Sequence, residues 1–204
     1  QAQWVANAYL LLLGALVLVG GALGDRYGRR RVFLAGVVVF TLASVACGLA
    51  PTAELLIAGR AAQGIGAALL TPASLAILGS SFGDKERGQA VGAWAGFGAL
   101  TAAIGPVLGG WLVDAVSWRA IFLINVPLAA AAIALTLKAV PESRDPDAGP
   151  LDLVGAALAA GGLAGVTWAL TDAPARGFGD PAVLAGLIGG LLALAGFVVW
   201  EART

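Results

Sequence analysis

The stretch Gly21-Ala22-Leu23-Gly24-Asp25-Arg26-Tyr27-Gly28-Arg29-Arg30-Arg31 decides how this chain folds. It separates two apolar runs, 4–23 and 32–50, each about long enough to cross a hydrocarbon core as a helix. A charged turn between two such runs must lie at a water interface, because lipid offers its charges no partners. Four of the chain's twelve basic residues lie in this turn, which predicts that it faces the cytoplasm.

Asp25 is the unusual member of this turn. It lies at the C-terminal end of the first predicted helix, where the macrodipole is already negative, so its charge costs roughly 0.3–1 kcal/mol. We therefore expect a balancing partner outside its own helix, either an arginine or the N-terminus of another helix. Two interpretations stay open: a contact with a distant part of the protein, or an ion pair with Arg26 or Arg29 in a solvated turn.

The composition is typical of a polytopic membrane protein. Of 204 residues, 59% are hydrophobic and 12% are charged, and 30 are glycine. The absence of histidine excludes imidazole catalysis and imidazole ligation, and the single cysteine, Cys47, excludes an internal disulfide. We expect an all-α membrane protein with no metal site and no cofactor.

Seven apolar runs predict seven membrane spans: 4–23, 32–50, 55–80, 89–116, 118–140, 153–171 and 181–200. With the first turn in the cytoplasm, nine basic residues fall on the cytoplasmic side and only Arg119 and Arg176 on the other. This asymmetry predicts a multi-pass protein of the cell membrane, with the start of the chain outside and its end in the cytoplasm. Because Gln1 stands where a start methionine would be, we also expect the chain to be an internal piece of a longer protein.

The charged turn resembles a family motif. Its pattern G-x-L-x-D-R-x-G-R-R is similar to the motif between the second and third helices of major facilitator superfamily transporters. In that family the aspartate and arginines latch the two halves of the protein together in one state of the transport cycle. The resemblance implies a conformational latch made of Gly21, Asp25, Arg26, Gly28, Arg29 and Arg30.

The opening residues 4–11 resemble the start of the second helix in the drug:proton antiporter group of that family. The resemblance implies that the chain carries about helices 2–8 of a fourteen-helix transporter. Residues 1–140 would then be the N-terminal bundle without its first helix, 141–152 a cytoplasmic linker, and 153–204 an extra helix pair that precedes the C-terminal half.

The third span carries an arginine on a face of small residues. Arg60, Gln63, Gly64, Ala67 and Ala68 share one helical face. Arg60 could be an interfacial arginine near Glu54, but the polar and small residues beside it favour a face that looks into a cavity or bundle. The stretch also resembles the family's R-x-x-Q-G-x-G-x-A motif, which implies proton coupling through Arg60, Gln63 and Gly64.

The fourth span carries a stripe of small residues, Gly98, Ala102, Gly105 and Gly109, with Pro106 expected to bend the helix. Ordinary close packing of membrane helices is one interpretation. The other is that 105–110 resembles the antiporter motif of the fifth helix, which is characteristic of exporters. That resemblance implies an antiporter helix with Gly98, Gly105, Pro106, Gly109 and Gly110. For Asn125, in the fifth span, we expect a packing hydrogen bond rather than a cavity contact.

The sequence argues against an enzyme. Residues 177–180, Gly-Phe-Gly-Asp, resemble the G-x-G-D of intramembrane aspartyl proteases, but they lie in a predicted loop and have no partner aspartate in a span. The basic residues report topology and not a nucleic-acid surface. We expect a secondary transporter that exports amphipathic or cationic small molecules by alternating access. Its expected partners are a small-molecule substrate, the lipid bilayer and the remaining half of the transporter, and its energy source is the proton gradient. The alternatives are a dedicated exporter of a metabolite, siderophore or lipid, and a non-transporting membrane scaffold.

Overall fold

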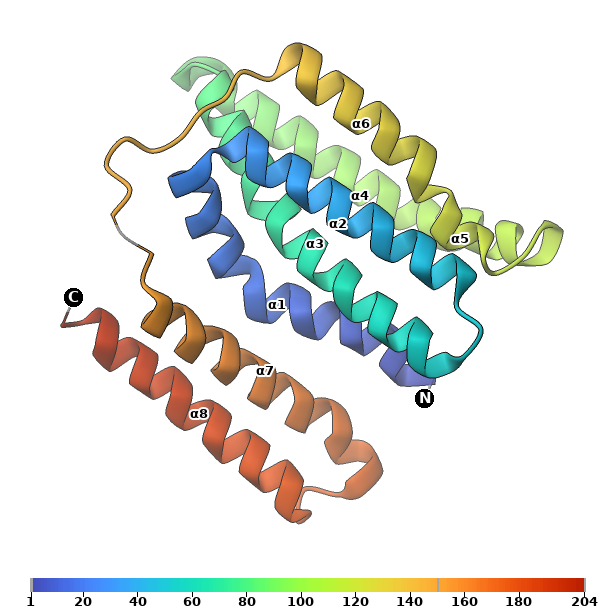
Figure 1. Cartoon of the computed structure of the whole chain (residues 1–204), viewed down its shortest axis with the longest axis vertical. Helices are drawn as coiled ribbons and strands as arrows, with labels where there is room; N and C mark the ends of the chain where they lie inside the picture. The colour runs from blue at the N-terminus through green and yellow to red at the C-terminus, as the bar shows by residue number, and fades with distance from the viewer. Residues whose placement is uncertain (1, 150, 204) are drawn as a thin grey trace.

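The computed structural model describes residues 2–149 and 151–203, and in that part of the chain all regular structure is helical. The helices are α1 (Ala2–Tyr27), α2 (Arg29–Leu49), α3 (Ala53–Ser81), α4 (Asp84–Ala115), α5 (Ala120–Leu123), α6 (Asn125–Ala139), α7 (Leu153–Arg176) and α8 (Pro181–Glu201). By length and composition they provide seven candidate membrane spans, with α5 and α6 forming one span together. The predicted all-α, seven-span architecture is confirmed (Figure 1).

The charged stretch is more helical than predicted. α1 continues to Tyr27 and α2 begins at Arg29, so only Gly28 lies between the two helices. Gly28 has a φ of 110°, a backbone conformation that residues with a Cβ rarely adopt. The predicted turn is therefore a single glycine hinge between two charged helix ends.

Glycines on α3 set its close packing against both neighbours. A Cβ added at Gly64 would lie 2.5 Å from the carbonyl oxygen of Tyr9 on α1, and one added at Gly66 would lie 2.6 Å from the backbone nitrogen of Phe40 on α2. Backbones this close leave no room for larger side chains, so the small residues fix the helix spacing. α3 is therefore the central helix of the N-terminal part of the chain.

α7 and α8 form a hairpin that lies along α1 (Figure 1). Within the hairpin, Ala169, Ala173 and Val183 are buried together, with Trp168 and Leu187 packed against them. Asp180 caps α8 by accepting hydrogen bonds from the backbone N–H groups of Ala182 and Val183. The assignment of 153–204 to an inserted pair, and the division into 1–140, 141–152 and 153–204, stay predictions.

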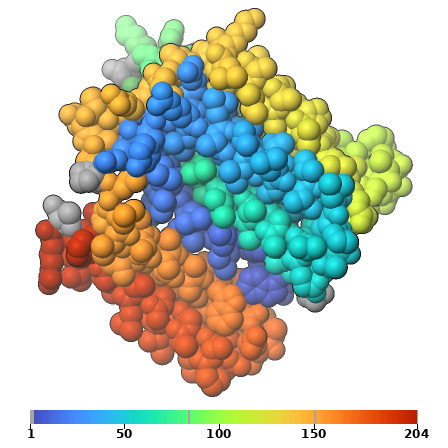
Figure 2. Space-filling view, in the orientation of Figure 1, coloured from blue at the N-terminus to red at the C-terminus, as the bar shows by residue number. Residues whose placement is uncertain are grey.

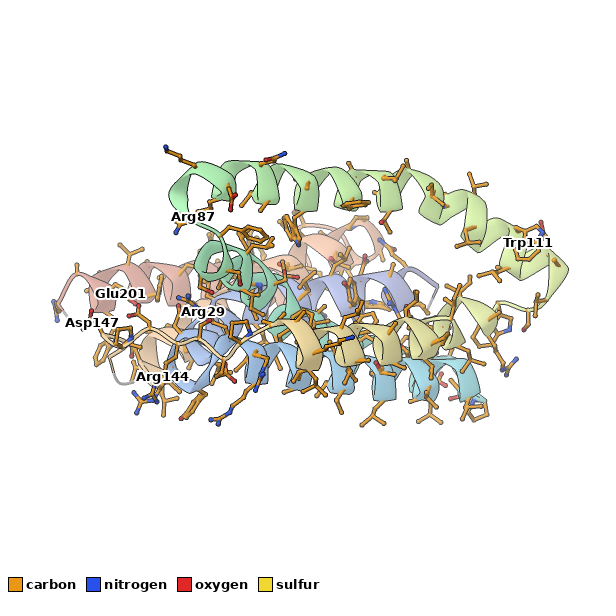
Figure 3. The ribbon with its side chains drawn as sticks, turned by 90° about the horizontal axis from the view of Figure 1, so that it is seen from above. Arg29, Arg87, Trp111, Arg144, Asp147 and Glu201 are labelled. Atoms are coloured by element: carbon orange, nitrogen blue, oxygen red, sulfur yellow. The ribbon has the colours of Figure 1, made fainter. Side chains whose placement is uncertain are left out.

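α4 stands apart from the other helices. In Figure 3 it forms a separate layer that joins the rest of the chain only at its two ends. None of its described residues is buried within the chain. Most of its apolar side chains therefore face the surroundings of this chain, which suits a bilayer or further protein packed against it.

The next span is broken near its start. α5 ends at Leu123 and α6 begins at Asn125. Pro127 has no N–H to bond the carbonyl of Leu123, which explains why the helix is interrupted there. Asn125 is therefore the first residue of α6.

Charged residues gather at one end of the bundle. Figure 3 shows Arg29, Arg87, Arg144, Asp147 and Glu201 at that end and Trp111 at the opposite end. This grouping agrees with the alternation predicted from the basic residues. Which end faces the cytoplasm stays a prediction.

Candidate functional site

Arg60 is held between α1 and α3 by contacts of three kinds. Its Nε donates a hydrogen bond of 2.9 Å to the carbonyl oxygen of Val5, and its Nη1 donates one of 2.8 Å to Oε1 of Gln63. The guanidinium carbon lies 4.4 Å from the centroid of the Tyr9 ring, a cation–π distance. The arginine is thus bound inside the helix bundle, as expected from the face that it occupies.

Gln63 continues the contacts of Arg60 into the bundle. Its side chain is only 1% exposed. Its Nε2 donates a hydrogen bond of 2.6 Å to Oγ of Ser44 on α2, and its Oε1 also lies 3.7 Å from Sγ of Cys47. Both ends of this buried amide are bound, as buried polar groups require.

The network reaches α6 through Asn125, whose Nδ2 donates a hydrogen bond of 3.3 Å to Oγ of Ser44. The packing hydrogen bond predicted for Asn125 is therefore present. Asn125 also lines an open pocket, the contact that the sequence did not favour. Tyr9, Ser44, Gln63 and Asn125 join α1, α2, α3 and α6 around the charge of Arg60.

Gly64 has a packing role in this network. Its missing side chain lets the backbone of α3 approach Tyr9 on α1. The neighbouring small residues of the same face, Ala67 and Ala68, are also buried. The shared face predicted from the sequence is therefore a buried helix–helix contact.

An open pocket of about 310 Å³ lies between α2, α3, α6 and Trp94 of α4. Its lining is mostly apolar and aromatic and has no charged side chain, and its polar groups are Thr41, Thr71, Ser74 and Asn125. The first three donate hydrogen bonds to carbonyls of their own helices. Such a lining suits an uncharged aromatic or aliphatic group better than an ion.

The charged ends of α1 and α2 are linked by an ion pair. Nη2 of Arg29 lies 2.8 Å from Oδ1 of Asp25, and Nε of Arg29 donates a second hydrogen bond of 3.1 Å to the same oxygen. Of the two interpretations of Asp25, the pair with Arg29 is the one that the described residues contain. Gly21 faces α3, where a Cβ would be in ordinary contact with Pro72.

The 141–152 linker lies against these helix ends, where the amber linker meets the blue helices in Figure 2. Oε1 of Glu142 accepts a hydrogen bond of 3.0 Å from the backbone N–H of Arg30, and Oε2 lies 3.6 Å from Nε of Arg31. The backbone N–H of Arg29 donates to the carbonyl of Ser143 at 2.8 Å.

Further bonds fix the rest of the linker. Nη1 of Arg26 donates to the carbonyl of Gly149 at 2.8 Å, and the backbone N–H of Asp145 donates to the carbonyl of Asp25 at 3.0 Å. Nη1 of Arg30 donates to the carbonyl of Val140 at 3.0 Å. The linker therefore binds Asp25, Arg26, Arg29 and Arg30, four of the residues predicted to form the latch.

The predicted antiporter helix is not packed against the rest of this chain. A Cβ added at Gly98, Gly105, Gly109 or Gly110 would meet no described atom within 4 Å. Pro106 lies inside the continuous helix α4, which curves toward the other helices on the Trp111 side in Figure 3. The role of this stripe stays a prediction, and any close neighbour must come from outside the described residues.

The sequence predicted Arg60, Gln63 and Gly64 but not Tyr9, Ser44 or Glu142. A serine in an apolar run and a tyrosine near a span end are common in membrane helices, so their types gave no signal. Glu142 lies in the linker 141–152, where no local pattern distinguishes it from the other acidic residues. No group of three or more His, Cys, Asp or Glu side chains among the described residues could hold a metal ion.

Known proteins resemble the chain over almost its whole length. A family model described as "Major Facilitator Superfamily" matches residues 1–202. The tetracenomycin C resistance and export protein of Streptomyces glaucescens is 38% identical over 202 residues, which cover 98% of this chain and 38% of that protein. The cephamycin export protein CmcT of Amycolatopsis lactamdurans is 42% identical over 204 residues, which cover 98% of this chain and 42% of that protein. The chain therefore spans about two fifths of the length of these relatives.

A solved structure shares the fold. It is a bacterial homologue of the human lysosomal transporter Spinster, in an inward-facing and unoccupied conformation. The TM-score is 0.50 at 24% sequence identity, over 94% of this chain and 52% of that protein. This likeness concerns the arrangement of the helices alone.

Proposed function

Because the chain belongs to the Major Facilitator Superfamily, we propose that the protein carrying it is a proton-coupled secondary transporter of the cell membrane. It exports amphipathic or cationic small molecules by alternating access, with the proton gradient as its energy source. The chain supplies spans of one half and the charged helix ends that face the cytoplasm. The other half of the transporter, the substrate and the bilayer are its partners.

The observation that carries this proposal is that a charged residue of a spanning helix, Arg60 of α3, is bonded to neighbouring groups within the helix bundle. A charged side chain costs about 2.5–3.5 kcal/mol at the centre of a bilayer on insertion scales, and less toward the end of a span, where Arg60 lies as the eighth residue of α3. Charged residues within spans commonly mark ion or substrate pathways. Here Val5, Tyr9 and Gln63 offset that cost. A scaffold built only for packing has no need of such a charge.

Arg60 has donor capacity left for a further partner. Its Nε and Nη1 are bound, whereas Nη2 makes no hydrogen bond to a described residue, and Arg60 takes part in no ion pair of the described chain. A guanidinium favours a carboxylate as its partner. We propose that a carboxylate outside this chain pairs with Arg60 and releases it when protonated, which couples proton binding to a movement of α3 against α1.

The Asp25–Arg29 pair provides the second part of the proposed cycle. It lies at the Gly28 hinge, where the two helix ends and the linker meet. Charge pairs of this kind hold one of two conformations, and a coupling of about 1–3 kcal/mol is enough to bias such an equilibrium. Asp25→Asn should therefore reduce transport while the protein still folds and reaches the membrane.

A dedicated exporter is the second candidate, because the two relatives named above are each called exporters of one antibiotic. A transport assay separates the candidates. The complete reading frame is expressed in cells, and accumulation of several chemically unrelated cationic dyes is measured with and without a protonophore. Broad export predicts lower accumulation of most dyes, reversed by the protonophore. A dedicated exporter leaves the dyes unaffected and confers resistance to one compound. Unchanged accumulation of every compound would reject export altogether.

A further inference from the structure

The hydroxyl group of Ser44 uses all of its hydrogen-bonding capacity. It donates to the carbonyl oxygen of Phe40 at 2.8 Å and accepts from Nε2 of Gln63 at 2.6 Å and from Nδ2 of Asn125 at 3.3 Å. A hydroxyl has one donor and two acceptor positions, so the group is saturated. Ser44 is completely buried, and its bonds reach α3 and α6 from α2.

The charge of Arg60 gives these bonds one direction. A guanidinium can only donate, so the oxygen of the Gln63 amide must face Arg60 and its nitrogen must face Ser44. Ser44 must then accept from Gln63, and its own proton goes to Phe40. With one lone pair left on the Ser44 oxygen, the amide nitrogen of Asn125 completes the set.

We propose that Ser44 is a positioning residue for Arg60. It holds the Gln63 amide in the orientation that accepts from the guanidinium, and it ties that amide to α6 through Asn125. Movement of Arg60 is thereby passed to α2 and α6 as well as α3. The inference rests on the proposed function, in which Arg60 takes part in proton coupling, but the geometry of the network can be tested separately.

Cys47 provides that separate test. It is the chain's only cysteine, it is buried, and its Sγ lies 3.7 Å from Oε1 of Gln63 and 3.8 Å from the carbonyl of Leu56. Replacing Ser44 by alanine leaves the buried nitrogen of the Gln63 amide without an acceptor, while the amide oxygen still faces Arg60. The contact between α2 and α3 around the Cys47 thiol then loosens.

The experiment uses the full-length protein with any cysteine outside this chain replaced. The variants are Ser44→Ala, Ser44→Thr, which keeps the hydroxyl, and the matched control Thr41→Val. Thr41 lies on the same helix and bonds to the carbonyl of Val37 as Ser44 does to Phe40, but it has no hydrogen bond to α3 or α6 among the described residues. The readouts are the alkylation rate of Cys47 by a small membrane-permeant maleimide and the pH profile of dye efflux.

We expect Ser44→Ala to speed Cys47 alkylation by about tenfold, the factor that corresponds to loss of one buried hydrogen bond. Its efflux should lose most of its pH dependence, whereas Ser44→Thr should keep the parent pH profile. Ser44→Thr and Thr41→Val should both keep the parent rate of Cys47 alkylation. Asn125→Leu, which leaves the Ser44–Gln63 bond intact, should alter the pH profile with little change in alkylation. The Asn125→Leu variant keeps the inference testable if Ser44→Ala does not fold.

A parent-like alkylation rate and a parent-like pH profile in Ser44→Ala would overturn the inference. If Ser44→Ala does not fold, a parent-like pH profile in Asn125→Leu would overturn it. A different result would reject the proposed function instead. If Ser44→Ala speeds alkylation but Arg60→Ala leaves the pH profile unchanged, the positioning geometry stands and Arg60 has no part in proton coupling.

Discussion

Glu142 caps α2 from a linker that lies 112 residues further along the chain than Arg30: its Oε1 accepts the backbone N–H of Arg30 at 3.0 Å. α2 begins with Arg29, Arg30 and Arg31, so three positive charges lie at the positive end of its macrodipole. A carboxylate at this point offsets both the arginines and the unpaired N–H groups of the first turn. The linker is therefore part of the charged hinge and not a free connection.

Replacing Glu142 by glutamine should test the charge of this cap. The amide keeps an oxygen for the Arg30 N–H but removes the negative charge, so we expect the free energy of unfolding to fall by about 0.3–1 kcal/mol. Thermal unfolding of the full-length protein in detergent measures the change. The matched control is Asp147→Asn, the same change of charge in the same linker, where no hydrogen bond to α2 lies among the described residues. Equal melting temperatures for both variants would show that the cap depends on hydrogen bonding alone.

The hinge glycine should not tolerate a side chain. Gly28 has a φ of 110°, and a Cβ there would lie 2.6 Å from Oε1 of Glu142. Gly28→Ala should therefore destabilise the protein by about 1–3 kcal/mol, the usual cost of a strained backbone conformation. Gly24→Ala is the matched control, because Gly24 is helical and a Cβ there meets no described atom within 4 Å. A Gly28→Ala variant as stable as Gly24→Ala would contradict the hinge.

Two introduced cysteines can show which side of the membrane each connection faces. Tyr27 and Phe178 are 53% and 64% exposed, and they lie in connections predicted to face opposite sides of the membrane. In a Cys47→Ala background, a membrane-impermeant maleimide added to intact cells should label Phe178→Cys and not Tyr27→Cys. Labelling of Tyr27→Cys after permeabilisation is the control for reactivity. Labelling of both in intact cells would disprove the predicted topology.

The α4 stripe should matter only through contacts outside this chain. Gly105 has no described atom within 4 Å of an added Cβ, whereas a Cβ at Gly66 would lie 2.6 Å from the backbone of Phe40. We expect Gly105→Val to reach the membrane in normal amounts but to block dye export, and Pro106→Ala to impair it. Gly66→Val should reduce the amount of folded protein by disrupting the α2–α3 contact. Normal export by Gly105→Val would leave the stripe without a role in transport.

The sequence predicted what depends on local composition and helical period. Span number follows from runs of apolar residues, and Arg60 and Gln63 share a face because they lie three residues apart. The site residues that the sequence did not predict are brought together by tertiary geometry. Ser44 bonds to a residue 19 positions away and Glu142 to one 112 positions away, which no local pattern encodes. Pro127 gave a signal for the break at Ile124 that the span assignment did not use.

The most direct test of the central claim is proton movement by the purified full-length protein in proteoliposomes. A pH-sensitive dye inside the vesicles reports proton flux when a transported substrate is added. The account predicts that the parent protein moves protons in exchange for substrate, that Arg60→Lys retains only a little of this flux because it lacks the planar fork, and that Arg60→Ala retains none. Substrate-driven proton flux at the parent rate in Arg60→Ala would contradict the account and leave Arg60 an interfacial arginine.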